Sequence, residues 1–215
     1  MLGFTTVRRN DGGDTLIEVI FAITVFSFIV VTAMSLMNQG AAAAQRSLEI
    51  TTVRQQMDGQ AEVLRFLHES YVEAYQSGQS FDIIDGASTP AEEYYKVIQE
   101  ATGRGEASKF GDPKLCTTRD LKDFILNSRT AKLITTKIQP GVFKAAPIYA
   151  QITFITGNQV LNSEGIWIEG IRSDDSADST APGYIDYHIR ACWDVPGSNL
   201  PMNLGTIVRL YEPRA

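Results

Sequence analysis

The feature that most constrains this chain of 215 residues is an uncharged run near its N-terminus. From Val19 to Gln45 there are 27 residues without a charged side chain, and the most apolar part ends at Met37. A membrane-spanning helix needs roughly 20 apolar residues, so the run is long enough to cross a bilayer. Arg8 and Arg9 precede it, and the positive-inside rule then keeps the N-terminus in the cytoplasm and sends the C-terminus outside.

A single carboxylate, Glu18, stands at the head of this run. A charge at the centre of a spanning helix costs about 2.5–3.5 kcal/mol even on lenient insertion scales, so its presence needs a reason. Two interpretations give no reason for Glu18. One is a signal peptide cut at the small residues Ala41–Ala44, and the other is a plain membrane anchor. The signal peptide would also need an apolar region longer than the usual stretch of about 7–15 residues.

A third interpretation uses the glycines Gly12 and Gly13 that come just before the run. A peptidase cleft can accept such a flexible dipeptide in extended form. Cleavage after Gly13 would leave a mature chain that begins at Asp14, with Glu18 as its fifth residue. In a staggered stack of such helices, Glu18 of one subunit would meet the new α-amino group of the next, and each charge would offset the other. We therefore expect Glu18 to be an assembly contact.

The segment GDTLIEVIFAITVFSFIVV, which begins at Gly13, resembles the processing and methylation motif of type IV prepilins and pseudopilins. The resemblance implies that prepilin peptidase removes a leader of residues 1–13 and that residue 14 is N-methylated. It also implies a single-pass membrane protein that the inner-membrane assembly machinery adds to an extracellular filament of pilin subunits. Asp14 departs from the family, whose first mature residue is usually phenylalanine or another apolar residue. Its carboxylate can pair with its own amine or with the helix N-terminus, which weakens the expectation of methylation and indicates a minor subunit.

The helical pattern continues beyond the apolar run, and no proline occurs before Pro90. We predict one helix from Asp14 to Tyr75, about 90 Å long at 1.5 Å per residue. The resemblance implies that residues 14–44 form the membrane and filament-core half, and that residues 45–215 form an extracellular domain. Apolar side chains at steps of three or four give the second half of the helix one apolar face: Ile50, Val53, Met57, Ala61, Leu64, Leu67, Tyr71 and Tyr75.

The rest of the chain predicts a connection and then a sheet. The connection, Gln76 to Pro147, has two helix candidates: one begins at Pro90 with Thr89 as its cap, and the other is TTRDLKDFILNS, with Thr118 as its cap. After Pro147 the apolar period becomes two, which predicts four or five strands in an antiparallel meander packed on the long helix, an α+β fold. The predicted strands lie near 148–154, 166–171, 185–193 and 206–212, with turns at 157–158 and 162–165.

Cys116 and Cys192 are the two cysteines of the chain, and an even count suits one disulfide in a domain outside the cytoplasm. The alternation near the C-terminus places Cys192 on the polar face of its strand, so a bond to Cys116 would staple the connection across the outer surface of the sheet. The chain-entropy model gives a loop of this length roughly 4 kcal/mol. Two unlinked thiols remain the alternative.

Charge is uneven along the chain. The net charge of −6 argues against attraction of the whole chain to nucleic acid. The stretch from Arg104 to Lys144 nevertheless has nine basic residues against four acidic ones, a net of +5. It predicts a solvated loop, a belt that faces an acidic surface of the next subunit, or a site for DNA or another anionic surface.

No enzyme motif occurs in the chain: HExxH, the P-loop, GxSxG and CxxC are all absent. Asp174, Asp175 and Asp178 resemble the opening of a calcium loop but lack its glycine and its closing glutamate. His68 has no second ligand nearby and is expected to be a partly buried helix residue. We therefore expect no catalysis, no cofactor and no metal.

Together these patterns predict a structural subunit of a type IV pilus filament. A pseudopilin of a type II secretion or DNA-uptake system shares the same signals, and a membrane-anchored extracellular binding domain is a further alternative. Glu18 discriminates the anchored binding domain from the two filament classes, because a monomeric anchor would tolerate its removal whereas a filament subunit would not.

Overall fold

The computed structural model describes residues 15–81, 89–104, 116, 122–173, 183–195 and 200–213. The chain divides into two compact units, residues 1–48 and residues 49–215, and each is described by itself. Helix α1 runs from Thr15 to Gln76, 62 residues without a break. The prediction of one long helix is confirmed, and the helix ends one residue after the predicted Tyr75. The predicted first residue, Asp14, lies outside the described residues.

In the second unit, α1 packs through the face that the sequence predicts. Met57, Ala61, Leu64 and Leu67 are all at most 4% exposed, and Val53 is fully buried. Ile50 and Tyr75 lie partly buried against the same core. The apolar stripe is therefore the face that α1 presents to the sheet, and burial of such a face is what stabilises a helix of this kind in a folded domain.

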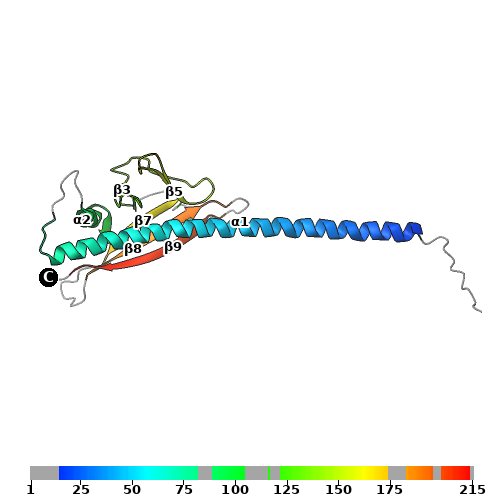
Figure 1. Ribbon diagram of the computed structural model, residues 1–215, viewed down its shortest axis with the longest axis horizontal. Coiled ribbons are helices and arrows are strands. Elements are labelled where there is room, and N and C mark those ends of the chain that lie inside the picture. The colour runs from blue at the N-terminus through cyan, green and yellow to red at the C-terminus, as the bar shows by residue number, and fades with distance from the viewer. Residues whose placement is uncertain are drawn as a thin grey trace, which may run out of the picture. The chain divides into compact units, whose positions relative to one another are not determined.

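Among the described residues the main sheet has six strands: five in the order β3-β2-β7-β8-β9, and β1, which is parallel to β7. Strands β7, β8 and β9 form an antiparallel meander, and Figure 1 shows them beside the second half of α1. The fold is thus α+β, as predicted. The strands are β1 (Thr102–Arg104), β2 (Phe124–Leu126), β3 (Leu133–Thr135), β7 (Ile166–Arg172), β8 (Tyr184–Trp193) and β9 (Met202–Tyr211).

Strand β8 confirms the period of two. Its core face is almost completely buried, at 1% exposure or less, because it looks toward the apolar face of α1. Tyr187 on this face donates a hydrogen bond to Tyr94. The residues of the core face are Ile185, Tyr187, Ile189, Ala191 and Trp193.

Helix α2 (Pro90–Glu100) begins as predicted, with Thr89 as its cap and Pro90 in the first turn. The Thr89 hydroxyl accepts from the backbone N–H of Glu92, and the Glu92 side chain accepts from the backbone N–H of Thr89 at 2.9 Å. This reciprocal capping box satisfies two donors that the helix itself leaves unpaired. The buried Glu93 carboxylate accepts from the backbone N–H of Leu133 at 2.7 Å, which ties α2 to β3.

The second helix candidate, TTRDLKDFILNS, is wrong in its described part. Phe124, Ile125 and Leu126 form strand β2, and all three are fully buried between β3 and β7. A strand buried on both faces reads as a continuous apolar run, which periodicity alone does not distinguish from a buried helix. The cap proposed at Thr118 lies outside the described residues.

The single meander is also wrong in one part, because β5 and β6 leave the main sheet. They form a separate three-stranded sheet with β4, in the order β4-β6-β5: β4 (Phe143–Lys144), β5 (Gln151–Phe154) and β6 (Val160–Glu164). Gly157 and Asn158 have positive φ and make the predicted turn, whereas most of the turn predicted at 162–165 belongs to β6.

Gly165 is the corner where the chain passes from the small sheet to the main sheet. Its φ is +70°, and a Cβ there would lie 2.1 Å from the carbonyl oxygen of Cys192. Its N–H donates to the carbonyl of Lys144 and its own carbonyl accepts from the N–H of Cys192, so it bonds to both sheets. Only glycine fits such a corner without strain.

Candidate functional site

The first candidate site is the exposed apolar part of α1 in the first unit. By length and composition this helix could cross a membrane, and it is the one such helix among the described residues. None of its most apolar window is buried, unlike the core helix of a soluble domain. Most large side chains of this part are more than half exposed: Leu16, Ile17, Val19, Ile20, Phe21, Ile23, Phe26, Phe28, Ile29, Val31, Met34, Leu36 and Met37.

The hydroxyl side chains within this apolar part bond to their own helix. Thr24 donates to the carbonyl of Ile20, one turn earlier. Ser27 and Thr32 do the same to the carbonyls of Ile23 and Phe28, each at 2.7 Å. A hydroxyl that is satisfied inside its helix costs far less in an apolar environment than a free one. These three residues are therefore compatible with lipid or with an apolar neighbouring helix.

Glu18 lies in the first turn of α1 and is exposed. The first N–H groups of a helix have no partner within it, and its N-terminus carries a partial positive charge that favours a carboxylate. Glu18 is thus compatible with the helix end while its side chain remains available to a neighbour. Gly13 and Asp14, the predicted cleavage and methylation residues, lie outside the described residues.

The second candidate feature is the disulfide, which the structure forms between Cys116 and Cys192, with Cα atoms 5.4 Å apart. Cys192 is only 1% exposed although it points away from the core face of β8. Arg190 on the same face is 3% exposed. Cys192 lies on the outer face of β8, as predicted, but this face is buried at this end of the strand. Period-two reasoning cannot detect that burial, because it depends on segments far away in sequence.

The same buried area contains an ion pair between the main strands. A guanidinium nitrogen of Arg190 lies 3.5 Å from Glu169 on β7, and Glu169 also accepts from the indole N–H of Trp167 at 3.2 Å. Trp167 is only 2% exposed. A buried charge pair of this kind needs all its partners, since removing one leaves the other charged and desolvated.

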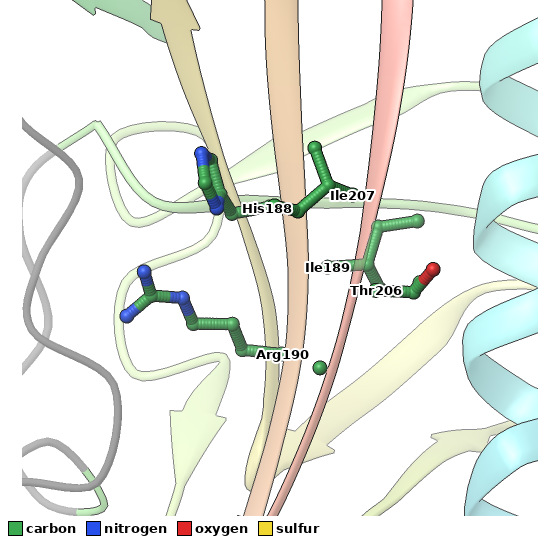
Figure 2. A pocket seen from close by; sticks show the side chains of 6 residues that line it. His188, Ile189, Arg190, Thr206 and Ile207 are labelled. Atoms are coloured by element: carbon green, nitrogen blue, oxygen red, sulfur yellow. The ribbon is translucent and has the colours of Figure 1, made fainter.

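A hollow of about 310 Å³ opens beside this area at the edge of the sheet. Its lining comes from three register pairs of β8 and β9, in which Gly205 stands opposite Arg190 and Ile207 opposite His188. Figure 2 shows His188 and Arg190 projecting from the same side of β8, whereas Thr206 lies on the other side of the sheet. The Thr206 hydroxyl is therefore not placed to exchange a proton with His188.

Electrostatics at this edge stabilise the strand pairing. Arg209 donates two hydrogen bonds of 2.7 Å to the carboxylate of Asp186, and this contact lowers the pKa of Asp186. Burial, and then the nearby charge of Arg190, lower the pKa of His188, against the opposite effect of Glu169 and Asp186. The neutral form of His188 is therefore favoured near pH 7. Arg190 pairs with Glu169 between β8 and β7, and Arg209 pairs with Asp186 between β9 and β8.

His68 is partly buried on α1, as predicted, and its Nε2 donates to the carbonyl of Tyr211 at 2.9 Å. That carbonyl belongs to β9, so His68 ties the helix to the strand. Among the described residues no group of three or more His, Cys, Asp or Glu side chains could hold a metal ion. Asp174, Asp175 and Asp178 lie outside the described residues.

The basic stretch from Arg104 to Lys144 is only partly described, since Lys109, Lys114 and Arg119 lie outside. Its described part contains β2, β3 and β4 and is therefore not a single loop. Arg129 bonds to Asn158 at 3.2 Å and lies over the ring of Phe154, 4.3 Å from its centroid.

One exposed aromatic residue escaped the sequence patterns. Phe66 on α1 is 51% exposed, although its neighbours Leu64 and Leu67 are fully buried. The available signal is its helical position, because Phe66 falls among charged side chains such as Glu62 and Glu69, where a polar residue is expected.

Comparisons with protein-family models, with curated proteins and with solved structures find no match to this chain.

Proposed function

We propose that the chain is a structural subunit of a type IV pilus filament. In this proposal, prepilin peptidase removes residues 1–13, the mature chain begins at Asp14, and the inner-membrane assembly machinery adds it to a filament of pilin subunits on the cell surface. The observation that carries the proposal is Glu18, an exposed carboxylate in the first turn of α1, directly before a long series of exposed apolar side chains.

The physical argument starts from the exposed apolar side chains, because a helix of this kind does not remain in water. Lipid covers it before assembly, with the N-terminus in the cytoplasm, and other copies of the helix cover it afterwards. Glu18 has a function only in the second environment, where the α-amino group of a neighbouring Asp14 offsets its charge. An anchor that never assembles has no use for it.

The first experiment is a mass measurement of the mature N-terminus in membranes and in sheared surface filaments. We expect a chain that begins at Asp14, and we expect Gly13→Val to leave the full-length precursor in the membrane. The same spectrum reports whether Asp14 carries a methyl group. A mature N-terminus near Gln45 would instead identify the apolar run as a signal peptide.

The second experiment replaces Glu18 in the full chain. Glu18→Ala should leave membrane insertion intact and abolish incorporation into filaments, because the neighbouring α-amino group loses its counter-charge. Thr32→Ala is the matched control, since it removes only a hydroxyl bonded within the helix. Normal function of Glu18→Ala would favour a membrane-anchored binding domain. Loss of secretion or DNA uptake without loss of surface pili would identify a pseudopilin.

A further inference from the structure

We propose that two different surfaces of the second unit dock on each other between neighbouring copies of this chain. One is the acidic stripe, which consists of Glu62, Phe66, Glu69 and Glu73 on α1. The other is the basic lobe, residues 127–165, which contains β3 to β6. The inference rests on the proposed function, because it names the partner surface that subunits use once they assemble.

The acidic stripe is a single exposed face of α1. Its members are separated by four, three and four residues, which places them above one another on one side of a helix. Phe66 is 51% exposed, and Glu62, Glu69 and Glu73 are exposed around it. Arg65 pairs with Glu62 at 2.6 Å, so the segment from Glu62 to Glu73 keeps three carboxylates against one guanidinium, a net of −2. A half-exposed phenyl ring in a row of carboxylates combines an apolar side chain with polar neighbours, as an interface does.

The basic lobe has the complementary composition. From residue 127 to residue 165 there are four basic side chains against one acidic side chain, a net of +3. The acidic residue, Glu164, accepts a hydrogen bond from Gln151 at 2.9 Å. Four large apolar side chains of the lobe are between 43% and 56% exposed: Ile138, Ile148, Ile155 and Leu161. The exposed basic side chains are Arg129, Lys132, Lys137 and Lys144.

Hydrogen bonds make the lobe one body rather than a set of loops. The side chain of Asn127, only 5% exposed, donates to the carbonyl of Asn158 while its backbone N–H donates to the carbonyl of Lys132. The turn before β3 is thereby tied to the turn between β5 and β6. Gln139 donates to the carbonyls of Val160 and Leu161, which holds the turn after β3 against β6. A surface with this support needs little ordering when a partner binds.

The two surfaces do not satisfy each other within one chain, because Phe66 and Ile138 are both about half exposed in the same structure. Each is therefore open to a partner from outside. Since the two surfaces differ, a contact between them is head-to-tail, and repetition of such a contact builds a ring or an open helical filament rather than a closed dimer. Opposite potentials of this kind steer and orient association more than they tighten it.

The test uses the full chain in membranes and in filaments, with the photo-cross-linking residue p-benzoylphenylalanine in place of Phe66. We expect a homotypic adduct whose peptide map ends in residues 127–165 of a second copy. The reciprocal probe at Ile138 should map to the segment around Phe66. Ile207, 59% exposed on β9, is the matched control position and should give neither adduct.

Charge reversal provides the second arm. Lys132→Glu with Lys137→Glu, or Glu69→Lys with Glu73→Lys, should each lower the adduct yield about tenfold, and combining both pairs should restore it. Lys96→Glu on α2 is the control for a charge change outside the two surfaces. Salt should act in the same direction, because the screening length falls from about 8 Å at physiological strength to about 3 Å at 1 M.

The outcomes separate this inference from the proposed function. Filaments that form normally while the Phe66 adduct maps elsewhere, or to a different protein, would overturn the docking and leave the filament proposal intact. Absence of both filaments and homotypic adducts would overturn both. Intact tryptophan fluorescence of each reversal variant shows that a loss of adduct is not a loss of fold, because Trp167 and Trp193 are both buried. The photo-probe alone decides the matter where a reversal variant does not fold.

Discussion

Gln60 offers a sharp test of how α1 is fixed to the sheet. Its side chain is 1% exposed; its amide nitrogen donates to the carbonyl of Leu126 at 2.8 Å, and its amide oxygen accepts from the Leu126 N–H at 2.7 Å. Strand β2 pairs with β7 at one position, where Phe124 stands opposite Ile168. The backbone N–H of Asn127 donates to the carbonyl of Lys132. Because bonded positions alternate along an antiparallel pair, the backbone groups of Leu126, the residue before, point away from β3. Gln60 therefore supplies the partner that the sheet does not.

Gln60→Met keeps the length of the side chain and removes both polar atoms. It leaves a buried N–H and a buried C=O without partners, at about 1–3 kcal/mol each. The added apolar burial returns roughly 1 kcal/mol, which is the transfer free energy of about one methylene group. We therefore expect the free energy of unfolding to fall by about 3 kcal/mol, an effect of the size expected for a broken buried network.

The measurement is urea unfolding of the full chain in detergent, followed by tryptophan fluorescence. The two tryptophans of the chain, Trp167 and Trp193, are both at most 2% exposed, so their emission reports the second unit. Gln55→Met is the matched control, because Gln55 is exposed on the same helix, and it should change stability by less than about 0.5 kcal/mol. If Gln60→Met is as stable as Gln55→Met, the bonds to Leu126 do not anchor α1.

Three further predictions concern the cap, the disulfide and pH. Thr89→Ala should lower the unfolding free energy by about 1 kcal/mol in the same assay, because it removes the capping box of α2. Cys116→Ser should cost up to about 4 kcal/mol and slow migration on a non-reducing gel, and unchanged migration would show that the wild-type thiols are free. Since the pKa of His188 lies below its ordinary value of 6.5, the unfolded chain takes up this proton first as the pH falls. This contribution to stability is therefore present above pH 6.5 and is lost as the pH falls through the folded pKa. His188→Gln should flatten that decline in urea midpoints, and an unchanged pH profile would contradict it.

The parts of the fold that the sequence predicted are those in which one face meets water. Alternation on β8 and the stripe on α1 both arise because buried and exposed positions repeat with the period of the element. The capping box at Thr89 could be predicted because it is local. Glu18 could be singled out because a carboxylate beside an apolar run conflicts with the cost of burying a charge.

The parts that could not be predicted depend on contacts distant in sequence. Strand β2 has three apolar residues buried on both faces, so its pattern contains no period. The division into two sheets depends on the corner at Gly165, whose positive φ the sequence does not reveal. Arg190 is buried on the outer face of β8, where it pairs with Glu169 on β7. The alternation of one strand gives no information about such a contact. Gln60 looked like an ordinary polar helix residue, since its partner lies 66 residues away.

The exposed apolar half of α1 does not by itself make the proposed assembly specific. Covering a large apolar side chain stabilises the system by about 1.5–3 kcal/mol relative to water, but lipid tails cover it as well as neighbouring helices do. Transfer of these side chains from bilayer to filament is therefore nearly neutral in hydrophobic free energy, and it cannot by itself drive or direct assembly. In this proposal the free energy that favours assembly comes from the polar groups that change environment. These are Glu18 at the helix end, and the acidic stripe and basic lobe in the second unit. Variants at these positions should consequently affect incorporation while membrane insertion stays unchanged, whereas Phe26→Ala or Ile29→Ala should weaken insertion and incorporation alike.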